Sequence, residues 1–228
     1  QLGRADAGFA TELVYGTLRM QGYYDRVIEI AARRPAGKID PPVLDVLRLG
    51  AHQLLSLRTA AHAVIDESVE LVRRARKASA AGFVNGVLRT IARDEPEVWR
   101  SGAVEGLAGD ARLAVEYSHP EWVVAALESA LAQEGAQAQL GQLLAADNVA
   151  PQVSLAALPG LAEVTALEAT GRYLPGRLSP LALGSSGGDP AAQPEVAAGT
   201  VRVQDEGSQL AALALTRARA VVAGERWL

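Results

Sequence analysis

Apolar side chains recur at helical spacing through residues 1–94, and this pattern constrains the fold more than any other feature of the sequence. The first apolar face comprises Phe9, Leu13, Thr17 and Met20, which lie four, four and three residues apart. Three more faces follow, formed by Leu44, Leu47, Ala51 and Leu54, by Ala63, Ile65, Val69 and Val72, and by Phe83, Val84, Val87, Leu88 and Ile91. Strand-like alternation is hard to find before residue 150. The sequence therefore predicts a compact all-α bundle over residues 1–94.

Capping signals mark where these helices begin and end. Asp40 before Pro41 and Pro42 predicts a helix start, with the aspartate side chain as the cap and proline in the first turn. Ser79 is the expected cap of the helix that carries Phe83. The basic run at residues 73–77 suits the C-terminal end of a helix, where the dipole attracts positive charge.

The second part of the chain changes character at Pro96. Gly102, Gly106 and Gly109 predict a loose connection, which is followed by helices over residues 123–131 and 137–146. After Pro151 the pattern predicts strands at 152–158, 181–183 and 200–204, with helices at 162–169 and 206–218. The expected fold class is mainly α, with a helical bundle over 1–94, a helical linker over 95–148 and a small α/β subdomain over 149–205.

Composition excludes several classes of protein. Cysteine is absent, which rules out disulfides, cysteine-ligated zinc, iron–sulfur clusters and a cysteine nucleophile within this chain. No apolar run approaches the roughly 20 residues of a membrane span. Residues 1–9 lack the apolar core of a signal peptide. We expect a cytoplasmic protein with no membrane and no metal among its partners.

The net charge of −4 conceals an asymmetry along the chain. Residues 1–100 hold 15 Lys and Arg against 12 Asp and Glu, whereas residues 101–228 hold 7 against 14. Thirteen of the first 15 are arginine, which binds phosphate through two donors and stacks on bases. The first part is therefore the expected place for a polyanion such as RNA, although a coding bias toward arginine gives the same composition.

Two groups of basic residues are the candidate RNA contacts. The first choice lies at the end of a predicted helix, where nearby Glu70 and Asp66 cannot pair all four cations: Arg73, Arg74, Arg76 and Lys77. A solvated helix end is the alternative interpretation of this group. The second choice comprises Arg19, Arg26, Arg33 and Arg34. Asn85 lies in an apolar helical stretch, where it either finds hydrogen-bond partners in the fold or faces RNA.

Patterns that carry catalytic chemistry in other proteins are incomplete here. The sequence GSSGG at residues 184–188 matches G-x-S-x-G, but helix-breaking residues follow Ser186 and no histidine follows His119. Lys38 follows a glycine, but the other positions of a phosphate-binding P-loop do not match. His52 and His62 lack the further ligands of a metal site. The residues alone indicate no catalytic constellation, and no catalytic residue is assigned.

Six segments, taken in order, carry a resemblance to a known family. They are FATELVYGTLR at residues 9–19, LRLGAHQLL at 47–55, AHAVIDESV at 61–69, GFVNGVLR at 82–89, YSHPEW at 117–122 and VQDEGSQ at 203–209. In this order they resemble the NusB-like RNA-binding domain fused to the Sun/Fmu/RsmB family of small-subunit ribosomal RNA cytosine-C5 methyltransferases. The resemblance spans nearly the whole chain.

This resemblance implies an expectation for function. The family methylates rRNA with S-adenosylmethionine, using a cysteine thiolate that adds to the base and a second cysteine that assists release. The cofactor loop and both cysteines lie beyond residues 224–228 in the family, so we expect a truncated, inactive chain that binds no S-adenosylmethionine but recognises small-subunit rRNA. The competing hypothesis is a stand-alone NusB-like module that acts in transcription antitermination or protein interaction.

The resemblance also assigns roles to the end of the chain. It implies that residues 149–205 form an RRM-like subdomain and that residues 206–228 begin the methyltransferase domain. It places four residues near the catalytic domain, as support for the active site: Gln204, Asp205, Glu206 and Ser208. Capping of the last helix by Asp205 is the alternative role for this segment.

Overall fold

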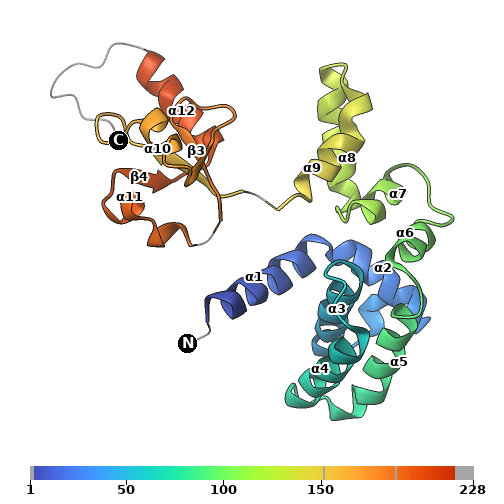
Figure 1. Cartoon of the computed structure of the whole chain (residues 1–228). Coiled ribbons are helices and arrows are strands. Elements are labelled where there is room, and N and C mark those ends of the chain that lie inside the picture. The colour runs from blue at the N-terminus through green and yellow to red at the C-terminus, as the bar shows by residue number, and fades with distance from the viewer. Residues whose placement is uncertain (1–2, 151, 188, 219–228) are drawn as a thin grey trace. The chain divides into compact units, whose positions relative to one another are not determined.

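The computed structural model describes residues 3–150, 152–187 and 189–218, and these divide into two compact units between residues 149 and 150 (Figure 1). The first unit is all helical, whereas the second contains a four-stranded antiparallel sheet. The expected fold class, mainly α with a small α/β part, is therefore confirmed. The finer boundaries at residues 94/95 and 205/206 stay predictions.

Five helices build the first part of the helical unit: α1 (Arg4–Arg19), α2 (Gln21–Ala32), α3 (Pro41–Leu55), α4 (Ala61–Arg74) and α5 (Ala81–Ile91). Helix α3 is central, because it packs against each of the other four. The shared core contains the fully buried side chains of Tyr24, Ile28, Leu47, Leu88 and Ile91. Removing these apolar side chains from water is the main stabilising contribution to the bundle.

The buried helix faces differ in detail from the predicted ones. Phe9 is 49% exposed, because α1 becomes buried against the bundle only near its C-terminal end, at Gly16 and Thr17. On α4 the buried row includes Val64 and Ser68 in place of the predicted Ala63 and Val69. Each prediction identified the helix but missed the part or face that its neighbours cover.

Both predicted caps are wrong as side-chain caps. Asp40 does precede α3, with proline in the first turn, but its carboxylate makes no capping hydrogen bond. Ser79 lies inside a 3-10 turn, η2 (Ala78–Ala80), that leads directly into α5. The residue before α5 is Ala80, whose backbone is already close to helical, so the serine is not placed where a cap is needed.

The expected loose connection after Pro96 is instead two short helices, α6 (Pro96–Ala103) and α7 (Gly109–Glu116). Pro96 occupies the first turn of α6, a position that proline favours. Trp99 anchors α6 to the main core, where its indole N–H donates to the Ile91 carbonyl at 2.9 Å. The prediction is therefore wrong at Gly102, which lies inside α6, whereas Gly106 does lie in a turn between the two helices.

The remaining helices of the first unit are α8 (Glu121–Gln133) and α9 (Leu140–Asp147), with a 3-10 turn, η3 (Gln137–Gln139), between them. They pack around a small core of Val124, Leu140 and Leu144. The helices predicted at residues 123–131 and 137–146 are thus confirmed, apart from the 3-10 start of the second.

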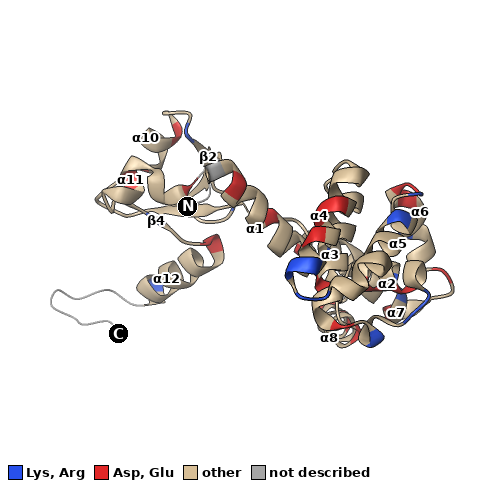
Figure 2. Cartoon of the chain, turned by 90° about the horizontal axis from the view of Figure 1, so that it is seen from below, with Lys and Arg blue, Asp and Glu red and all other residues tan. Residues whose placement is uncertain are grey.

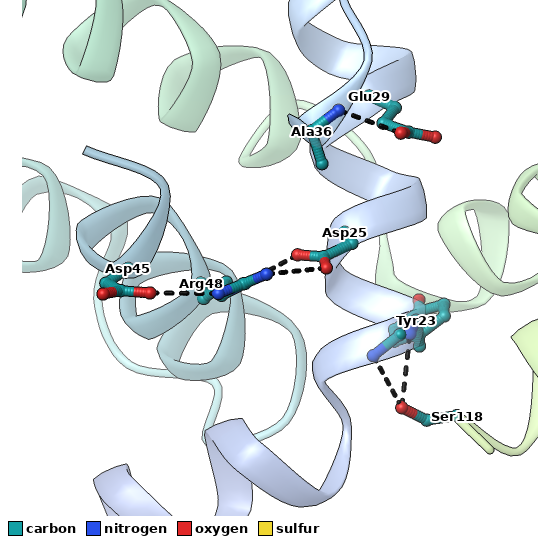
Figure 3. Close-up of polar contacts among 8 residues, drawn as sticks. Tyr23, Asp25, Glu29, Ala36, Asp45, Arg48 and Ser118 are labelled. Carbon is teal, nitrogen blue, oxygen red and sulfur yellow. Dashed lines mark hydrogen bonds and ion pairs between the residues drawn. The ribbon is translucent and has the colours of Figure 1, made fainter. Parts of the chain in front are cut away.

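Ser118 joins this region to the N-terminal helices (Figure 3). Its Oγ accepts hydrogen bonds from the backbone N–H groups of Gly22, at 2.9 Å, and of Tyr23, at 3.3 Å. These two groups belong to the first turn of α2 and have no partner within the helix. A residue 96 positions away in sequence therefore caps α2. This gives the YSHPEW segment a structural role.

The second unit contains strands β1 (Ser154–Ala157), β2 (Tyr173–Pro175), β3 (Ala182–Ser185) and β4 (Val201–Val203), in the order β2-β3-β1-β4. Helix α10 (Val164–Glu168) follows β1, while the turn η4 (Pro190–Ala192) and α11 (Pro194–Ala197) follow β3. The result is a β-α-β-β-α-β arrangement. Sequence analysis missed β2 and α11, which are short. Helix α12 (Glu206–Ala218) begins where it was predicted, and the predictions for residues 219–228 lie outside the described residues.

Candidate nucleic-acid interface

The first group of predicted RNA contacts lies at the C-terminal end of α4, where the acidic positions of the helix give way to basic ones (Figure 2). Glu70 forms ion pairs with two of these basic residues, since its carboxylate lies 3.1 Å from Arg74 and 3.9 Å from Arg73. All three side chains are largely exposed. Exposed pairs of this kind contribute at most about 1 kcal/mol, so both arginines remain able to exchange Glu70 for a phosphate.

Lys77 has a partner that sequence reasoning missed. Its Nζ lies 2.7 Å from the Oδ2 atom of Asp40, at the start of α3. Glu70 pairs with only two of the four cations, as expected, and the partner of Lys77 is a carboxylate distant in sequence that was not expected. Arg76 is exposed in the left-handed region at φ 60°, and no carboxylate among the described residues lies within ion-pair distance of it.

The second group is split by the fold. Arg33 ends α2 in the left-handed conformation, and the next residue, Arg34, lies with its guanidinium carbon 5.6 Å from the ring centroid of Phe83 on α5. A guanidinium at this distance from an aromatic ring gains a cation–π attraction. Arg34 and Phe83 line a hollow of about 330 Å³ that also includes Ile39, Asp40, Val43, Ser79 and Ala80. We call it the Phe83 hollow.

The structure thus brings two sequence-distant basic segments to one place. Arg34 borders the Phe83 hollow directly, and Lys77 reaches it through its ion pair with Asp40. Phe83 is half-buried and supplies an aromatic face beside the cations. Sequence analysis assigned Phe83 to the core, although its place in the GFVNGVLR segment marked the region. Arginine, lysine and an aromatic ring together form the kind of surface that binds phosphates and stacked bases.

Arg19 and Arg26 lie elsewhere. Arg26 donates from Nε to the Ala103 carbonyl at 3.3 Å and lies 3.8 Å from Glu29. Arg19 acts electrostatically on His52, near the end of α3. His52 lies twelve residues beyond Asp40 on that helix, about 18 Å away at the rise of an α-helix. The eight predicted contacts therefore do not form one surface, and Arg19 and Arg26 do not border the Phe83 hollow.

Arg48, although basic, is occupied within the fold (Figure 3). Its guanidinium donates to both carboxylate oxygens of Asp25, at 2.7 and 2.8 Å, and to Asp45 at 3.0 Å. The hydrogen bonds from Arg48 to Asp25 raise the pKa of its guanidinium above the ordinary value. This bidentate ion pair, in which the arginine side chain is 18% exposed, holds α2 against α3.

Asn85 makes a local contact, accepting a hydrogen bond from Arg89 at 3.1 Å.

The four residues predicted to support an active site all make contacts inside the second unit. The Asp205 carboxylate accepts from the Ser208 N–H at 2.9 Å and from the Ser208 hydroxyl at 2.6 Å, which lowers the pKa of Asp205. This is the capping geometry that was the alternative interpretation. The Gln204 carbonyl accepts from the buried side chain of Gln209 at 2.9 Å.

Glu206 closes a loop of the same unit. Its carboxylate accepts hydrogen bonds from the backbone N–H groups of Arg177 at 3.0 Å, of Leu178 and of Ser179 at 2.8 Å. These bonds, led by that from Ser179, lower the pKa of Glu206. The position of Glu206 therefore couples the start of α12 to the segment before β3. Its proposed role toward an active site stays a prediction.

The rejected hydrolase pattern also lacks the required geometry. Ser186 follows β3, and its hydroxyl donates to the Arg172 carbonyl at 2.9 Å. The next described element is η4, which starts only at Pro190, so no helix begins at the serine as a nucleophile elbow requires.

Within the described ranges, no three His, Asp or Glu residues come together as a metal site would need. None of the described helices is long and apolar enough to cross a membrane.

The first unit is thus an all-helical bundle that carries a hollow lined by Arg34 and Phe83. Residues 1–93 match the model of the NusB family.

Relatives extend the match beyond that domain. The chain is 44% identical over 233 residues to "Putative methyltransferase Rv1407" of Mycobacterium tuberculosis. This match covers the whole chain and 50% of that protein. It is 30% identical over 150 residues to the ribosomal RNA small subunit methyltransferase B of Serratia proteamaculans, with 66% of the chain and 32% of that protein covered. These matches confirm the resemblance. The chain spans half or less of the length of these curated relatives.

A solved structure supports the fold. The crystal structure of PH0851 superposes with a TM-score of 0.64 at 17% identity, covering 90% of this chain and 46% of that one. At this identity the likeness concerns the fold alone.

Proposed function

We propose that this chain is the RNA-recognition part of an S-adenosylmethionine-dependent methyltransferase that modifies cytosine C5 in small-subunit rRNA. The observation that carries the proposal is the Phe83 hollow, where Arg34 lies over an aromatic ring and Asp40 binds Lys77, in the part of the chain that matches the NusB family. The names of the relatives supply the rRNA substrate class and the methyl-transfer reaction. A cytoplasmic location follows from that substrate.

The chain's own residues bind and position RNA in this proposal, and they carry out no chemical step. Arg73, Arg74 and Arg76 contact phosphates beside the Phe83 hollow, and Phe83 offers a face to a base. S-adenosylmethionine would supply the methyl group. Ser185, at the end of β3, and Ser186 after it are engaged in internal hydrogen bonds, so these two hydroxyls are not free to hold it. With no cysteine, this chain is expected to be inactive alone.

A stand-alone NusB-like module is the competing function. The identity to Rv1407 continues through residues 150–228, beyond the NusB domain, and this favours the methyltransferase proposal.

The test is salt-dependent binding of the chain to a small-subunit rRNA fragment. Replacing Arg73, Arg74 and Arg76 by Glu should weaken binding and flatten the dependence of log K on log salt by roughly two, because each lost single-strand phosphate contact removes about 0.7 from the slope. Arg93→Glu, at an exposed arginine outside both candidate groups, is the control for the effect of one charge reversal. Equal binding by the triple variant and the wild type would overturn the assigned surface.

A further inference from the structure

Helix α1 is attached to the bundle only near its C-terminal end. Among the residues of α1 whose burial is described, only Gly16 and Thr17 are buried, whereas Phe9 and Val14 are about half exposed. A single residue, Met20, separates α1 from α2, and its backbone (φ −102°, ψ 19°) is not helical. Sparse burial and a one-residue joint are the features of an element that opens while the rest of the fold stays intact.

The buried end of α1 lies directly against His52 of α3. A Cβ at Gly16 would lie 2.5 Å from the Nε2 atom of the imidazole, so only glycine permits this close approach. The histidine is 3% exposed. Because Gly16 covers the Nε2 edge of the ring, water reaches this edge only when α1 moves away.

Two buried polar atoms meet at this junction without a hydrogen-bond partner among the described residues. They are the Nε2 atom of His52 and the Oγ1 atom of Thr17. The other ring nitrogen of His52, Nδ1, lies 2.8 Å from the Tyr24 hydroxyl, which faces it from α2. Burying a polar group without a partner is unfavourable, so the docked position of α1 is stabilised less than its apolar contacts alone would imply.

The charges that act on His52 also belong to α1. Burial is the largest effect and lowers the pKa of the imidazole from 6.5. The charge and backbone of Glu12 raise this pKa, whereas the charge of Arg19 lowers it. The Glu12 carboxylate lies 3.7 Å from Nε2 and its side chain is 47% exposed, so the ion pair that a protonated imidazole would form is weak. Docked α1 therefore disfavours the protonated histidine.

We infer that α1 is a hinged arm that leaves the bundle when His52 is protonated. A buried imidazolium needs water or a close counter-ion. Gly16 excludes the water, and Glu12 is too far away and too exposed to replace it. Opening at Met20 hydrates both the imidazolium and the Thr17 hydroxyl. This inference does not depend on the function proposed for the Phe83 hollow.

The direction of the pH dependence follows from the same contacts. In the open state His52 is hydrated and titrates at its ordinary pKa of 6.5, above its value in the docked state. The open state therefore binds a proton first as the pH falls. Opening becomes more favourable below pH of about 6.5 and stops responding once the pH is below the docked-state pKa of His52.

Native-state amide hydrogen exchange of the full chain, between about pH 8 and about pH 5, tests the inference after correction for the intrinsic pH dependence of exchange. A released helix of 16 residues is marginal in water, so the amides of residues 16–20 report on opening. Their opening constant should rise roughly threefold or more toward low pH, while the amides of residues 84–91 in α5 stay protected. An equal loss of protection in both segments would show that the whole bundle unfolds, and would overturn the inference.

Three variants assign the pH dependence to His52. His52→Gln should abolish it. Glu12→Gln removes the carboxylate that faces Nε2, so opening should increase more toward low pH than in the wild type. Asp6→Asn is the matched control, because it removes one acidic charge from an exposed position in the first turn of the same helix, and it should keep the wild-type response. Either a response that persists in His52→Gln or equal responses in Glu12→Gln and the wild type contradict the inference. Glu12→Gln decides the matter even if His52→Gln does not fold.

A pair of glycine variants tests the contact itself. Gly16→Ala places a methyl group against the His52 ring, so residues 16–20 should lose protection at every pH while α5 stays protected. Gly8→Ala is the control on the same helix, because a Cβ there meets nothing within 4 Å, and it should leave the opening constant unchanged. Wild-type protection of residues 16–20 in Gly16→Ala, or loss of protection throughout the bundle, would show that α1 is not an independent arm.

Discussion

The Nζ atom of Lys77 lies 2.7 Å from the Oδ2 atom of Asp40, and this ion pair ties the basic end of α4 to the start of α3. Asp40 also lines the Phe83 hollow. One carboxylate therefore restrains a lysine that would otherwise face a polyanion. The pair is partly exposed, so its contribution to stability is small.

Asp40→Asn should increase RNA affinity about two- to fivefold at low salt, because it frees Lys77 and removes a negative charge beside the Phe83 hollow. The free energy of unfolding should fall by at most about 1 kcal/mol, since the side chain makes no capping hydrogen bond. Fluorescence anisotropy with labelled RNA measures the first effect. Asp66→Asn, at an exposed acid on α4, is the control. An equal increase of RNA affinity in Asp66→Asn would mean that the change of net charge, and not the release of Lys77, causes the effect.

Alanine substitutions at two helical glycines should change the free energy of unfolding in opposite directions. A Cβ at Gly50 would lie 2.7 and 2.8 Å from the Leu88 methyl groups, so Gly50→Ala should destabilise the bundle by about 1–2 kcal/mol. Gly86 of α5 has open space at the same position, and Gly86→Ala should stabilise by about 0.5–1 kcal/mol. Urea unfolding of the two variants checks the contrast. Stabilisation by Gly50→Ala would mean that α3 and α5 do not approach this closely.

The free energy of unfolding should decrease as the pH is lowered, because His52 is buried. Burial lowers the pKa of its imidazole from 6.5, against a smaller raising effect of Glu12 and a lowering effect of Arg19. The unfolded chain therefore binds a proton first. The resulting stability is fully present above pH of about 6.5 and is lost as the pH falls through the folded-state pKa.

Urea unfolding at several values between about pH 8 and about pH 5 reveals this dependence. His52→Gln retains a group that can hydrogen-bond to Tyr24, which lies 2.8 Å from the His52 Nδ1 atom, and should reduce the slope of unfolding free energy against pH. His62→Gln, at an exposed histidine, should keep the wild-type slope. A slope that is unchanged in His52→Gln would refute this assignment.

Glu206→Gln should loosen the loop before β3. The neutral amide cannot accept from three backbone N–H groups as strongly as the carboxylate does, so amide exchange at residues 177–179 should accelerate about tenfold or more. Because the pKa of Glu206 is lowered from 4.5, the wild-type contact should persist below that pH and disappear as the pH falls through the folded-state pKa. Glu168→Gln, on α10, is the control and should leave these amides protected.

Much of the fold could be predicted because it depends on local pattern. Helical spacing identified α1, α3, α4, α5 and α8, and alternation identified β1 and β4. The errors have tertiary causes. Gly102 suggested a loop, but it lies inside α6, which burial of Trp99 stabilises. The Asp40 side chain resembled a cap, but its carboxylate binds a lysine from another helix.

By itself, the sequence determined the helical class of residues 1–94, the α/β character that follows, the absence of cysteine chemistry and the family resemblance. These depend on residue type and on spacing along the chain. Only the tertiary structure decided which cations have partners: Lys77 with Asp40, Arg48 with Asp25, and Arg34 over Phe83. It also decided that the buried Tyr23 hydroxyl has no hydrogen-bond partner among the described residues. Electrostatic and hydrogen-bonding partners depend on distance in space, and residues that meet across helices can lie far apart in sequence.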